Sequence, residues 1–333
     1  MRRALPFACK IAATGSYLPA RIVPNRDLEA FLDTSDAWIR ERTGIGARHV
    51  AADDEVTSDL AAQAARRALE RAGIDVGGVD MIIVATVTPD GPMPACAVRV
   101  QHKLGATTIP AFDVSAACAG FLFGVTIADQ FICSGAMQRV LVVGVELLSR
   151  IIDWSDRTTA VLFGDGAGAV VLERAPADSE QRIELCRIHS EGALADALSI
   201  PAGGSAEPVT ERALHMRRNK VQMVGQEVFR AAVRGIADVG AEVVADAGLT
   251  MADIDRFVPH QANVRILSAV AERWGVPLDR FVLVLEETGN TSSASIPIAL
   301  DRGLRDGRIA SGERVLMCAL GAGVSYGAVL ARV

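Results

Sequence analysis

The sequence predicts an α/β protein made of two similar halves that pack against each other. Short apolar, β-branched runs alternate with helical patterns in the first half, which indicates a layered core. Three short matches recur in the second half at one shared offset of 175 residues: position 72 with 247, 80 with 255, and 139 with 314. Because the offset is shared, we infer an internal repeat and place the halves at residues 1–175 and 176–333.

The strands and helices of the first half follow from its hydrophobic pattern. Three runs are typical of strands covered on both faces in a mostly parallel sheet: residues 81–87, 109–114 and 140–144. Residues 58–72 have a helical pattern that ends at Gly73, a C-cap residue. Residues 114–128 are apolar but too few to span a bilayer, so we expect a buried core helix. In a duplicated fold of this kind, the strand ends of both halves converge on one central site.

Composition narrows the class of protein. The chain has 333 residues, 50% of them hydrophobic, which excludes intrinsic disorder. Its 34 basic and 40 acidic residues disfavour wholesale binding to nucleic acid or to an anionic membrane. The six cysteines lack metal-site spacing and form no evident disulfide framework, so we expect a cytoplasmic protein without a bound metal. An enzyme acting on small molecules is the leading class.

Cys118 is the first candidate for chemistry. It follows a strand and a run of small residues, and an apolar helix begins at or just after it. A thiol at a helix N-terminus faces the positive end of the helix dipole, which favours the thiolate. The alternative is a buried core cysteine, which is common for a cysteine in an apolar run.

His260 and Asn290 are the candidates in the second half. His260 lies at the end of a predicted strand, where an imidazole can exchange protons or donate to a developing oxyanion. The repeat offset carries position 118 to 293, so the turn that contains Asn290 is the counterpart of the cysteine turn. Taken alone, His260 could be a structural histidine and Asn290 an ordinary helix cap.

Two glycine-rich stretches carry less information. Residues 164–169 lack the order of a dinucleotide-binding fingerprint, and a tight turn explains them. Residues 321–323 follow a predicted strand, and the backbone N–H of Ala322 is a candidate for an oxyanion hole.

Together these segments closely resemble the β-ketoacyl-acyl-carrier-protein synthase III family of the thiolase superfamily, over almost the whole chain. Five stretches in order carry the resemblance: residues 35–45, 117–121, 163–168, 260–263 and 289–292. The resemblance implies a thiolase-like fold, with two duplicated halves in five α-β-α-β-α layers. It also implies an acyltransferase that begins fatty acid biosynthesis by joining an acyl-coenzyme A primer to malonyl-acyl carrier protein, with loss of carbon dioxide.

The family's catalytic residues match Cys118, His260 and Asn290 of this chain. The resemblance implies that Cys118 accepts the acyl group as a thioester, while His260 and Asn290 stabilise the enolate left by decarboxylation. The backbone N–H groups of Cys118 and Ala322 would form the oxyanion hole. No metal or redox cofactor is implied.

Binding residues are also implied by position. The coenzyme A contacts match Trp38, Arg42, Arg157 and Asn263. Contacts to the acidic carrier protein match Arg230 and Arg265. Residues 211–234 support the second assignment, because they hold six basic and two acidic residues, a local charge of +4 in a chain of −6. Without the resemblance, residues 211–234 would be interpreted as an ordinary solvated helix face.

Two positions depart from the family's commonest pattern. Leu320 and Met93 stand where relatives often place phenylalanines around the acyl pocket, the second from the partner subunit of a homodimer. Methionine adapts to irregular shapes, so we expect primers longer than acetyl to be accepted.

Three rival interpretations remain. A related ketosynthase or acyltransferase of secondary metabolism, using an unusual acyl group, is the strongest. A degradative thiolase needs a second cysteine beside the C-terminal glycines, and Cys318 is one residue out of place, which turns a strand side chain to the opposite face. A non-catalytic binding protein is disfavoured because Cys118, His260 and Asn290 are all present.

Overall fold

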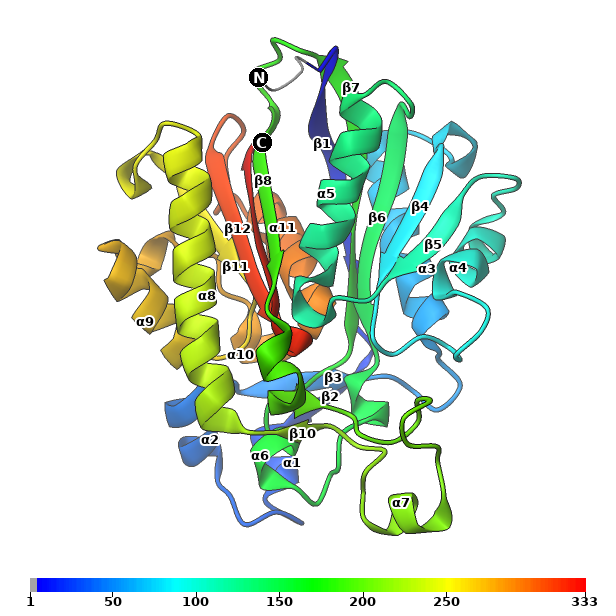
Figure 1. Cartoon of the computed structure of the whole chain (residues 1–333), viewed down its shortest axis with the longest axis vertical. Helices are drawn as coiled ribbons and strands as arrows, with labels where there is room; N and C mark the ends of the chain where they lie inside the picture. The colour runs from blue at the N-terminus through cyan, green and yellow to red at the C-terminus, as the bar shows by residue number, and fades with distance from the viewer. Residues whose placement is uncertain (1–4) are drawn as a thin grey trace.

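The computed structural model describes residues 5–333 and contains two central sheets (Figure 1). The first sheet has the order β1-β7-β6-β4-β5 and the second β11-β12-β13-β8. The first comprises β1 (Phe7–Tyr17), β4 (Met81–Ala85), β5 (Ala111–Val114), β6 (Arg139–Glu146) and β7 (Gly166–Pro176). The second comprises β8 (Arg182–Ser190), β11 (Arg256–Pro259), β12 (Arg314–Gly321) and β13 (Ser325–Arg332). The three predicted strands are confirmed as β4, β5 and β6.

The sheets are mixed rather than mostly parallel. β4 is parallel to β5 and β6, as expected, but β7 is antiparallel to both β6 and β1. In the second sheet, β11 and β12 are parallel and the remaining pairs are antiparallel. The connection from β6 to β7, residues 147–165, holds only short helical turns and begins β7 beside the end of β6, so the two strands run antiparallel.

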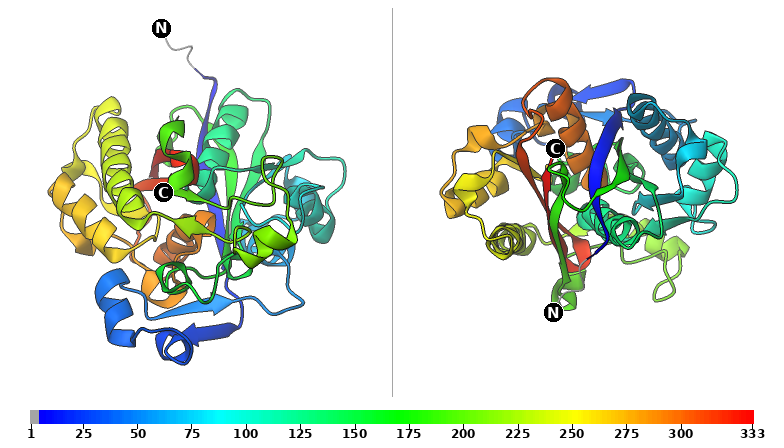
Figure 2. Two further views of the ribbon diagram at one scale, coloured as in Figure 1. Left: turned by 60° about the horizontal axis from the view of Figure 1, so that its bottom comes forward. Right: turned by 90° about the horizontal axis from the view of Figure 1, so that it is seen from above.

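Six long helices complete the five predicted layers. In chain order they are α3 (Thr57–Ala72), α4 (Cys96–Leu104), α5 (Gly120–Cys133), α8 (Gly225–Asp246), α9 (Val264–Trp274) and α11 (Ser295–Arg305). α5 and α11 lie between the two sheets, α3 and α4 cover the outside of the first, and α8 and α9 cover the outside of the second (Figures 1 and 2). α5 is apolar on most of its surface because it is covered from both sides.

The remaining elements gather at the lower end of Figure 1. They are β2 (Arg21–Pro24), α1 (Asn25–Leu28), α2 (Asp36–Thr43), β3 (Ala47–Val50), α6 (Arg157–Ala160), β9 (Leu198–Ser199), α7 (Glu211–His215), β10 (Gln222–Met223) and α10 (Leu285–Thr288). None of the described helices is both long and apolar enough to cross a membrane.

The helix over residues 58–72 is confirmed as α3, and Gly73 ends it with a left-handed φ of 68°. The expected core helix over residues 114–128 was placed too early. Val114 still belongs to β5, a single 3-10 turn covers Ala117–Ala119, and α5 begins only at Gly120. Ala117 has a φ of 47°, a left-handed conformation that a regular α-helix cannot include.

The repeat offset reappears in the backbone. Ala117 and Ser292, which are 175 positions apart, both have left-handed φ values, 47° and 48°. Each opens a 3-10 turn that leads into a central helix, α5 or α11. The division placed between residues 175 and 176 falls at the end of β7, and the two sheets take their strands from either side of it. That each half is a separate domain stays a prediction.

Candidate active site

Cys118 lies in the turn between β5 and α5, where two backbone segments meet closely. Its side chain is 8% exposed. A Cβ atom on Gly321, at the end of β12, would stand 2.7 Å from the backbone N of Cys118 and 2.7 Å from the carbonyl oxygen of Ala116. Glycine is therefore required at position 321, because any side chain would push the two halves apart at the sulfur.

The surroundings of Cys118 shift the pKa of its thiol in both directions. Burial raises the pKa of its thiol to about 11, while a hydrogen bond from Ser292 lowers that pKa and the nearby Glu146 carboxylate raises it. Burial thus favours the protonated thiol in the free protein. The effect of the helix N-terminus acts in the opposite direction, and its preference for the thiolate stays a prediction.

His260 follows β11 and is almost fully buried, with 2% exposure. Its backbone N–H donates to the carbonyl of Cys318 at 2.8 Å, and its Nδ1 lies 2.7 Å from the Ser295 hydroxyl oxygen. That oxygen already accepts from the backbone N–H of Gln261 at 3.3 Å, which leaves the hydroxyl hydrogen to donate to Nδ1. With the serine hydroxyl donating to Nδ1, the imidazole hydrogen is on Nε2, and this is the tautomer that the proposed chemistry uses.

Burial lowers the pKa of His260 to about 3, so the ring is neutral. A neutral imidazole with its hydrogen on Nε2 is a hydrogen-bond donor that does not titrate near pH 7. The ring can stabilise a developing oxyanion without carrying a positive charge itself.

Asn290 is held by one hydrogen bond to the first half of the chain and by another within its own turn. Its backbone N–H donates to the carbonyl of Leu162 at 2.9 Å, and its side-chain oxygen accepts from the backbone N–H of Ser292 at 2.9 Å. With the oxygen occupied, the amide –NH₂ group is free to donate. The isolated bridge between Phe163 and Asn290 joins the first half of the chain to the second.

Two cavities meet at Cys118. The first, of about 60 Å³, is lined by Cys118, His260 and Asn290 together with Leu320 and Ala322. The second, of about 230 Å³, also begins at Cys118 and has mainly apolar walls. Those walls include Val87, Leu148, Ile151, Leu198, Ile200 and Val221. The structure thus brings the three predicted catalytic residues to the first cavity. The second cavity, with apolar walls, also opens at Cys118.

The predicted coenzyme A residues also lie together, at the surface. Trp38 of α2 has the guanidinium carbons of Arg42 and Arg157 at 5.0 and 4.9 Å from its ring centroid. Arg157 donates to the carbonyl of Asp33 at 2.6 Å. The hydrophobic cluster that supports Trp38 includes Leu162, which lines the cavity of Cys118, His260 and Asn290.

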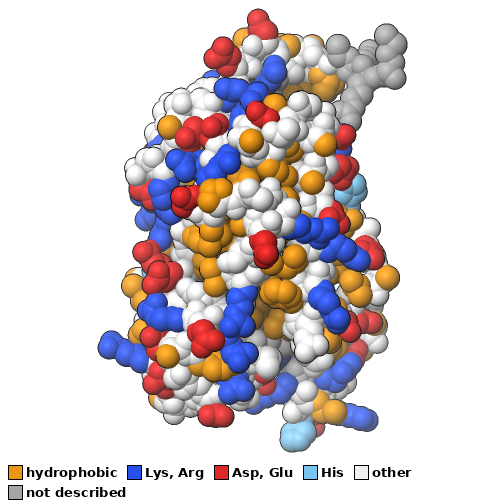
Figure 3. Space-filling model, turned by 90° about the vertical axis from the view of Figure 1, so that its left-hand side faces the viewer, with side chains coloured by type: hydrophobic (Ala, Val, Ile, Leu, Met, Phe, Trp, Pro, Cys, Tyr) orange, Lys and Arg blue, Asp and Glu red, His pale blue; other side chains and the backbone are white. Residues whose placement is uncertain are grey.

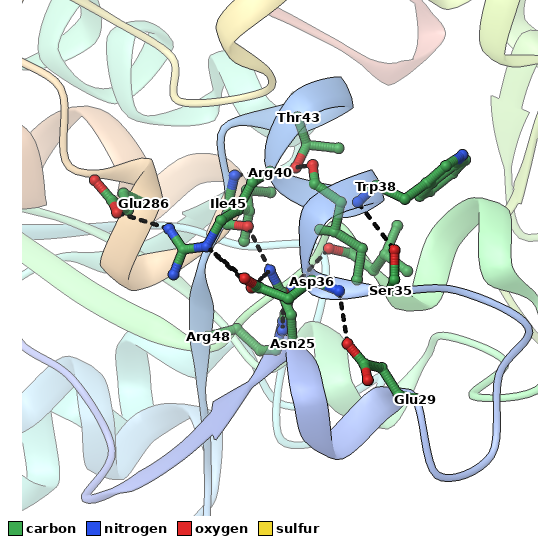
Figure 4. A network of polar contacts seen from close by, with 12 residues as sticks. Asn25, Glu29, Ser35, Asp36, Trp38, Arg40, Thr43, Ile45, Arg48 and Glu286 are labelled. Atoms are coloured by element: carbon green, nitrogen blue, oxygen red, sulfur yellow. Dashed lines mark hydrogen bonds and ion pairs between the residues drawn. The ribbon is translucent and has the colours of Figure 1, made fainter.

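A polar network fixes the position of α2 (Figure 4). Asp36 accepts from the Asn25 side chain at 2.9 Å and pairs with Arg40, which also reaches Glu286 at 2.8 Å. The side chain of Trp38 points away from this network. The helix is thus anchored on one side and presents an aromatic ring on the other.

The other predicted binding residues are exposed or half-buried. Asn263 is the N-cap of α9, and its side-chain oxygen accepts from the backbone N–H of Arg265 at 2.8 Å. Arg265 lies 3.5 Å from Glu41. Arg230 lies on α8 beside the exposed Phe229, on the face that also carries Arg234. Figure 3, which views the side formed by α8 and α9, shows basic side chains around a hollowed apolar strip.

The two predicted acyl-pocket residues have different surroundings. Leu320 lines the cavity that contains Cys118, His260 and Asn290, and it packs against Gly235 of α8. Met93 is 86% exposed and lines neither cavity. Its assignment depended on the partner subunit of a dimer and stays a prediction.

Sequence reasoning missed several residues that shape the site. Ser295 orients His260, Ser292 contacts both Cys118 and Asn290, and Glu146 lies beneath them. One signal was visible: Glu146 ends an otherwise apolar strand, where a charged residue is out of place unless it is paired. No described group of three or more His, Cys, Asp or Glu side chains could hold a metal ion.

Comparison with known proteins adds an independent result. The family model "3-Oxoacyl-[acyl-carrier-protein (ACP)] synthase III" matches residues 112–192, and the model of its C-terminal part matches residues 244–333. A β-ketoacyl-[acyl-carrier-protein] synthase III of Erythrobacter litoralis is 49% identical, over 97% of this chain and 98% of that protein.

Solved structures give the same result. The crystal structure of 3-oxoacyl-[acyl-carrier-protein] synthase III from Aquifex aeolicus is 42% identical, has a TM-score of 0.90, and is matched over 98% of this chain and 100% of its own. The priming β-ketosynthase of the R1128 polyketide biosynthetic pathway is 37% identical, also with a TM-score of 0.90, over 100% of this chain and 98% of that chain.

Proposed function

Since this chain belongs to the β-ketoacyl-[acyl-carrier-protein] synthase III family, we propose that Cys118, His260 and Asn290 catalyse that family's reaction here. The reaction is a decarboxylating condensation of an acyl-coenzyme A primer with malonyl-acyl carrier protein, and it initiates fatty acid biosynthesis. The observation that carries the assignment of residues is the meeting of two cavities at Cys118, one with His260 and Asn290 and the other apolar.

The first half-reaction transfers the primer's acyl group to Cys118. The sulfur attacks the thioester carbon, coenzyme A leaves as a thiol, and the proton of Cys118 ends on the departing sulfur. The backbone N–H groups of Cys118 and Ala322 stabilise the tetrahedral oxyanion, and Gly321 lets these two groups come close together. The acyl chain then occupies the apolar cavity.

The second half-reaction forms the carbon–carbon bond. Nε2–H of His260 and the amide of Asn290 donate to the thioester oxygen of malonyl-acyl carrier protein. Carbon dioxide leaves, the resulting enolate carbon attacks the acyl carbon on Cys118, and the released thiolate takes up a proton. Because the imidazole is neutral, it remains a donor throughout the cycle.

Malonyl-acyl carrier protein and the primer are the partners that the family implies. We place the carrier protein on the α8 face, where Arg230 lies near the cavity entrance and the local excess of basic residues steers an acidic partner. Arg265 on α9 extends the same face. A homodimer, a cytoplasmic location and the need for neither metal nor redox cofactor are further parts of the proposal.

Trp38 is proposed as the stacking surface for the adenine of coenzyme A. A base on its ring takes the place of one of the guanidinium groups, Arg42 or Arg157, which now lie over that ring. Asn263 would donate to the pantetheine arm with its free amide group.

Replacement of Trp38 by alanine is expected to raise KM for the primer by roughly 10-fold or more, because stacking of a base is worth about 1–3 kcal/mol. The value of kcat should stay within about twofold, since the stacked base is remote from the reacting carbon. Steady-state kinetics with varied acyl-coenzyme A measures both. Phe31→Ala removes another exposed aromatic ring and should change neither constant; a fall in kcat with unchanged KM for Trp38→Ala would contradict the assignment.

The size of the apolar cavity predicts the primers. A volume of about 230 Å³ is much more than an acetyl group fills, being about the share of seven or eight water molecules in the liquid. We expect butyryl- and hexanoyl-coenzyme A to be used at least as well as acetyl-coenzyme A. Ile151→Phe, which adds bulk to the cavity wall, should reduce use of the longer primers and spare acetyl. Activity with acetyl alone in the unmodified protein would contradict this prediction.

The experiment that tests the function is a stoichiometric assay with purified protein, an acyl-coenzyme A and malonyl-acyl carrier protein. We expect one carbon dioxide and one free coenzyme A for each β-ketoacyl-acyl carrier protein formed. The alternative is a related ketosynthase or acyltransferase of secondary metabolism that uses an unusual acyl group, and the similarity to the priming β-ketosynthase supports its ketosynthase form. A ketosynthase of this kind would prefer another acyl-coenzyme A over short straight-chain primers. An acyltransferase would release coenzyme A without carbon dioxide, and either result would overturn the proposal.

A further inference from the structure

Glu146, the last residue of β6, is a buried carboxylate that the catalytic steps above do not use. It has no exposed surface, and it accepts five hydrogen bonds from two segments of the chain. One oxygen, Oε2, accepts from the hydroxyls of Thr86 and Thr88, at 3.2 and 2.8 Å, and from the backbone N–H of Val87 at 3.0 Å. The other, Oε1, accepts from the hydroxyls of Ser292 and Ser293, at 3.2 and 3.0 Å.

The carboxylate thereby ties the first half of the chain to the second. Ser292 and Ser293 belong to the turn that corresponds to the cysteine turn in the repeat, and Ser292 has a left-handed φ of 48°. A residue other than glycine in this conformation is strained unless its surroundings hold it. Gly144, two residues before Glu146, lies so close that an added Cβ would stand 2.2 Å from the carbonyl oxygen of Ser293.

Ser292 connects this carboxylate to the reacting groups. Its backbone N–H orients the side chain of Asn290, and Ser292 lines the apolar cavity together with Cys118, where its side chain lowers the pKa of the thiol. Val87, held by Oε2, lines the apolar cavity together with Cys118 and Ser292. Glu146 is therefore one side chain away from both the nucleophile and an enolate donor.

We propose that Glu146 is a positioning residue for the condensation: it holds the Ser292 turn against Cys118 and Asn290, and its negative charge opposes formation of the thiolate. The inference rests on the proposed function and deepens it. The titratable group that faces this carboxylate is the thiol of Cys118, and within residues 5–333 no Lys, Arg or His forms an ion pair with it. Its hydrogen-bond partners, in the segment that follows β4 and in the Ser292 turn, are neutral donors.

The charge itself is sensitive to pH. Burial raises the pKa of Glu146 to about 7, although the hydrogen bonds from Thr88, Val87, Ser293 and Ser292 act in the opposite direction. Above that pH the ionised carboxylate disfavours a second negative charge on Cys118. Near neutral pH, therefore, both the neutral and the ionised form of the Glu146 carboxyl group are populated.

The test is the pH dependence of Cys118 alkylation by iodoacetamide, followed by mass spectrometry of the whole folded protein. Glu146→Gln keeps the shape: its oxygen can accept from Val87, and its –NH₂ can donate to the serine oxygens. We expect its alkylation midpoint to fall by about one pH unit, because the like charge is gone. Ser292→Ala removes the hydroxyl that lowers the pKa of the Cys118 thiol, so its midpoint should rise.

Asp165→Asn is the matched control. Asp165 is another fully buried carboxylate, bonded to Ala51 and Ser149 rather than to the cysteine turn, and its replacement should leave the midpoint unchanged. An unchanged midpoint in Glu146→Gln, or an equal shift in Asp165→Asn, would overturn the inference. If Glu146→Gln does not fold, Ser292→Ala is the test. An alkylation midpoint of Ser292→Ala that does not rise contradicts the proposed connection between Glu146 and Cys118 through Ser292. Alkylation needs no primer, so a failure of the proposed function would show separately, as no acyl-enzyme in the unmodified protein.

Discussion

Replacement of His260 by alanine is expected to separate the two half-reactions. Acyl transfer to Cys118 should continue, because in the proposed mechanism its oxyanion is held by the backbone N–H groups of Cys118 and Ala322 and not by the imidazole. Decarboxylation should fall by roughly 10²–10³-fold, the usual loss when one donor to a developing oxyanion is removed. The measurements are the rate of acyl-enzyme formation by mass spectrometry and the rate of carbon dioxide release from malonyl-acyl carrier protein.

The fold makes this separation physically reasonable. His260 is held by Ser295 and by the backbone of Cys318, so its loss removes one donor without moving the cysteine turn. His102→Ala, which alters an exposed histidine on α4, is the control and should leave both rates unchanged. If His260→Ala lost acyl transfer and decarboxylation to the same extent, the division of roles between the imidazole and the backbone would be wrong.

Replacement of Gly321 by alanine is expected to abolish both half-reactions. The new methyl group would stand 2.7 Å from two backbone atoms, the N of Cys118 and the O of Ala116, and neither can move alone. Relief of that contact displaces the Cys118 and Ala322 N–H groups from each other, which removes the oxyanion hole. We expect acyl-enzyme formation to fall by at least about 10²-fold.

Loss of folding must be distinguished from loss of the oxyanion hole. Circular dichroism and a thermal melt of Gly321→Ala establish whether the fold persists. Gly204→Ala is the control, because a Cβ at that exposed glycine meets no atom within 4 Å and should change nothing. A folded Gly321→Ala protein that acylates Cys118 at the normal rate would rule out the proposed oxyanion hole.

Much of the fold could be predicted because it depends on local pattern. The apolar runs of β4, β5 and β6 and the capped helix α3 were visible as periodicity and as a terminal glycine. The repeat offset of 175 relates the turn at position 118 to the turn at position 293, and each of these turns has a left-handed residue, Ala117 or Ser292. The small residues around Cys118 indicated the start of α5 correctly, just after the cysteine. The apolar run from Val114 placed it too early, because apolar composition does not reveal the left-handed residue at Ala117.

The site was only partly predictable. Cys118, His260 and Asn290 stood out through residue type and repeat position, and the structure brings all three to one cavity. The protonation states could not be read from the sequence, since burial sets the pKa values of Cys118 and His260. Glu146 and Ser295 were missed because their importance depends on contacts with residues far away in the chain, which no local pattern encodes.

The central claim is that a buried cysteine holds the primer between the two half-reactions. The most direct measurement is the mass of the intact protein after incubation with butyryl-coenzyme A, followed by peptide mapping and then by addition of malonyl-acyl carrier protein. We predict a single butyryl adduct on Cys118 that disappears as the β-ketoacyl product forms. An unmodified protein that still turns over, or an adduct on another residue such as Cys318, would contradict the account.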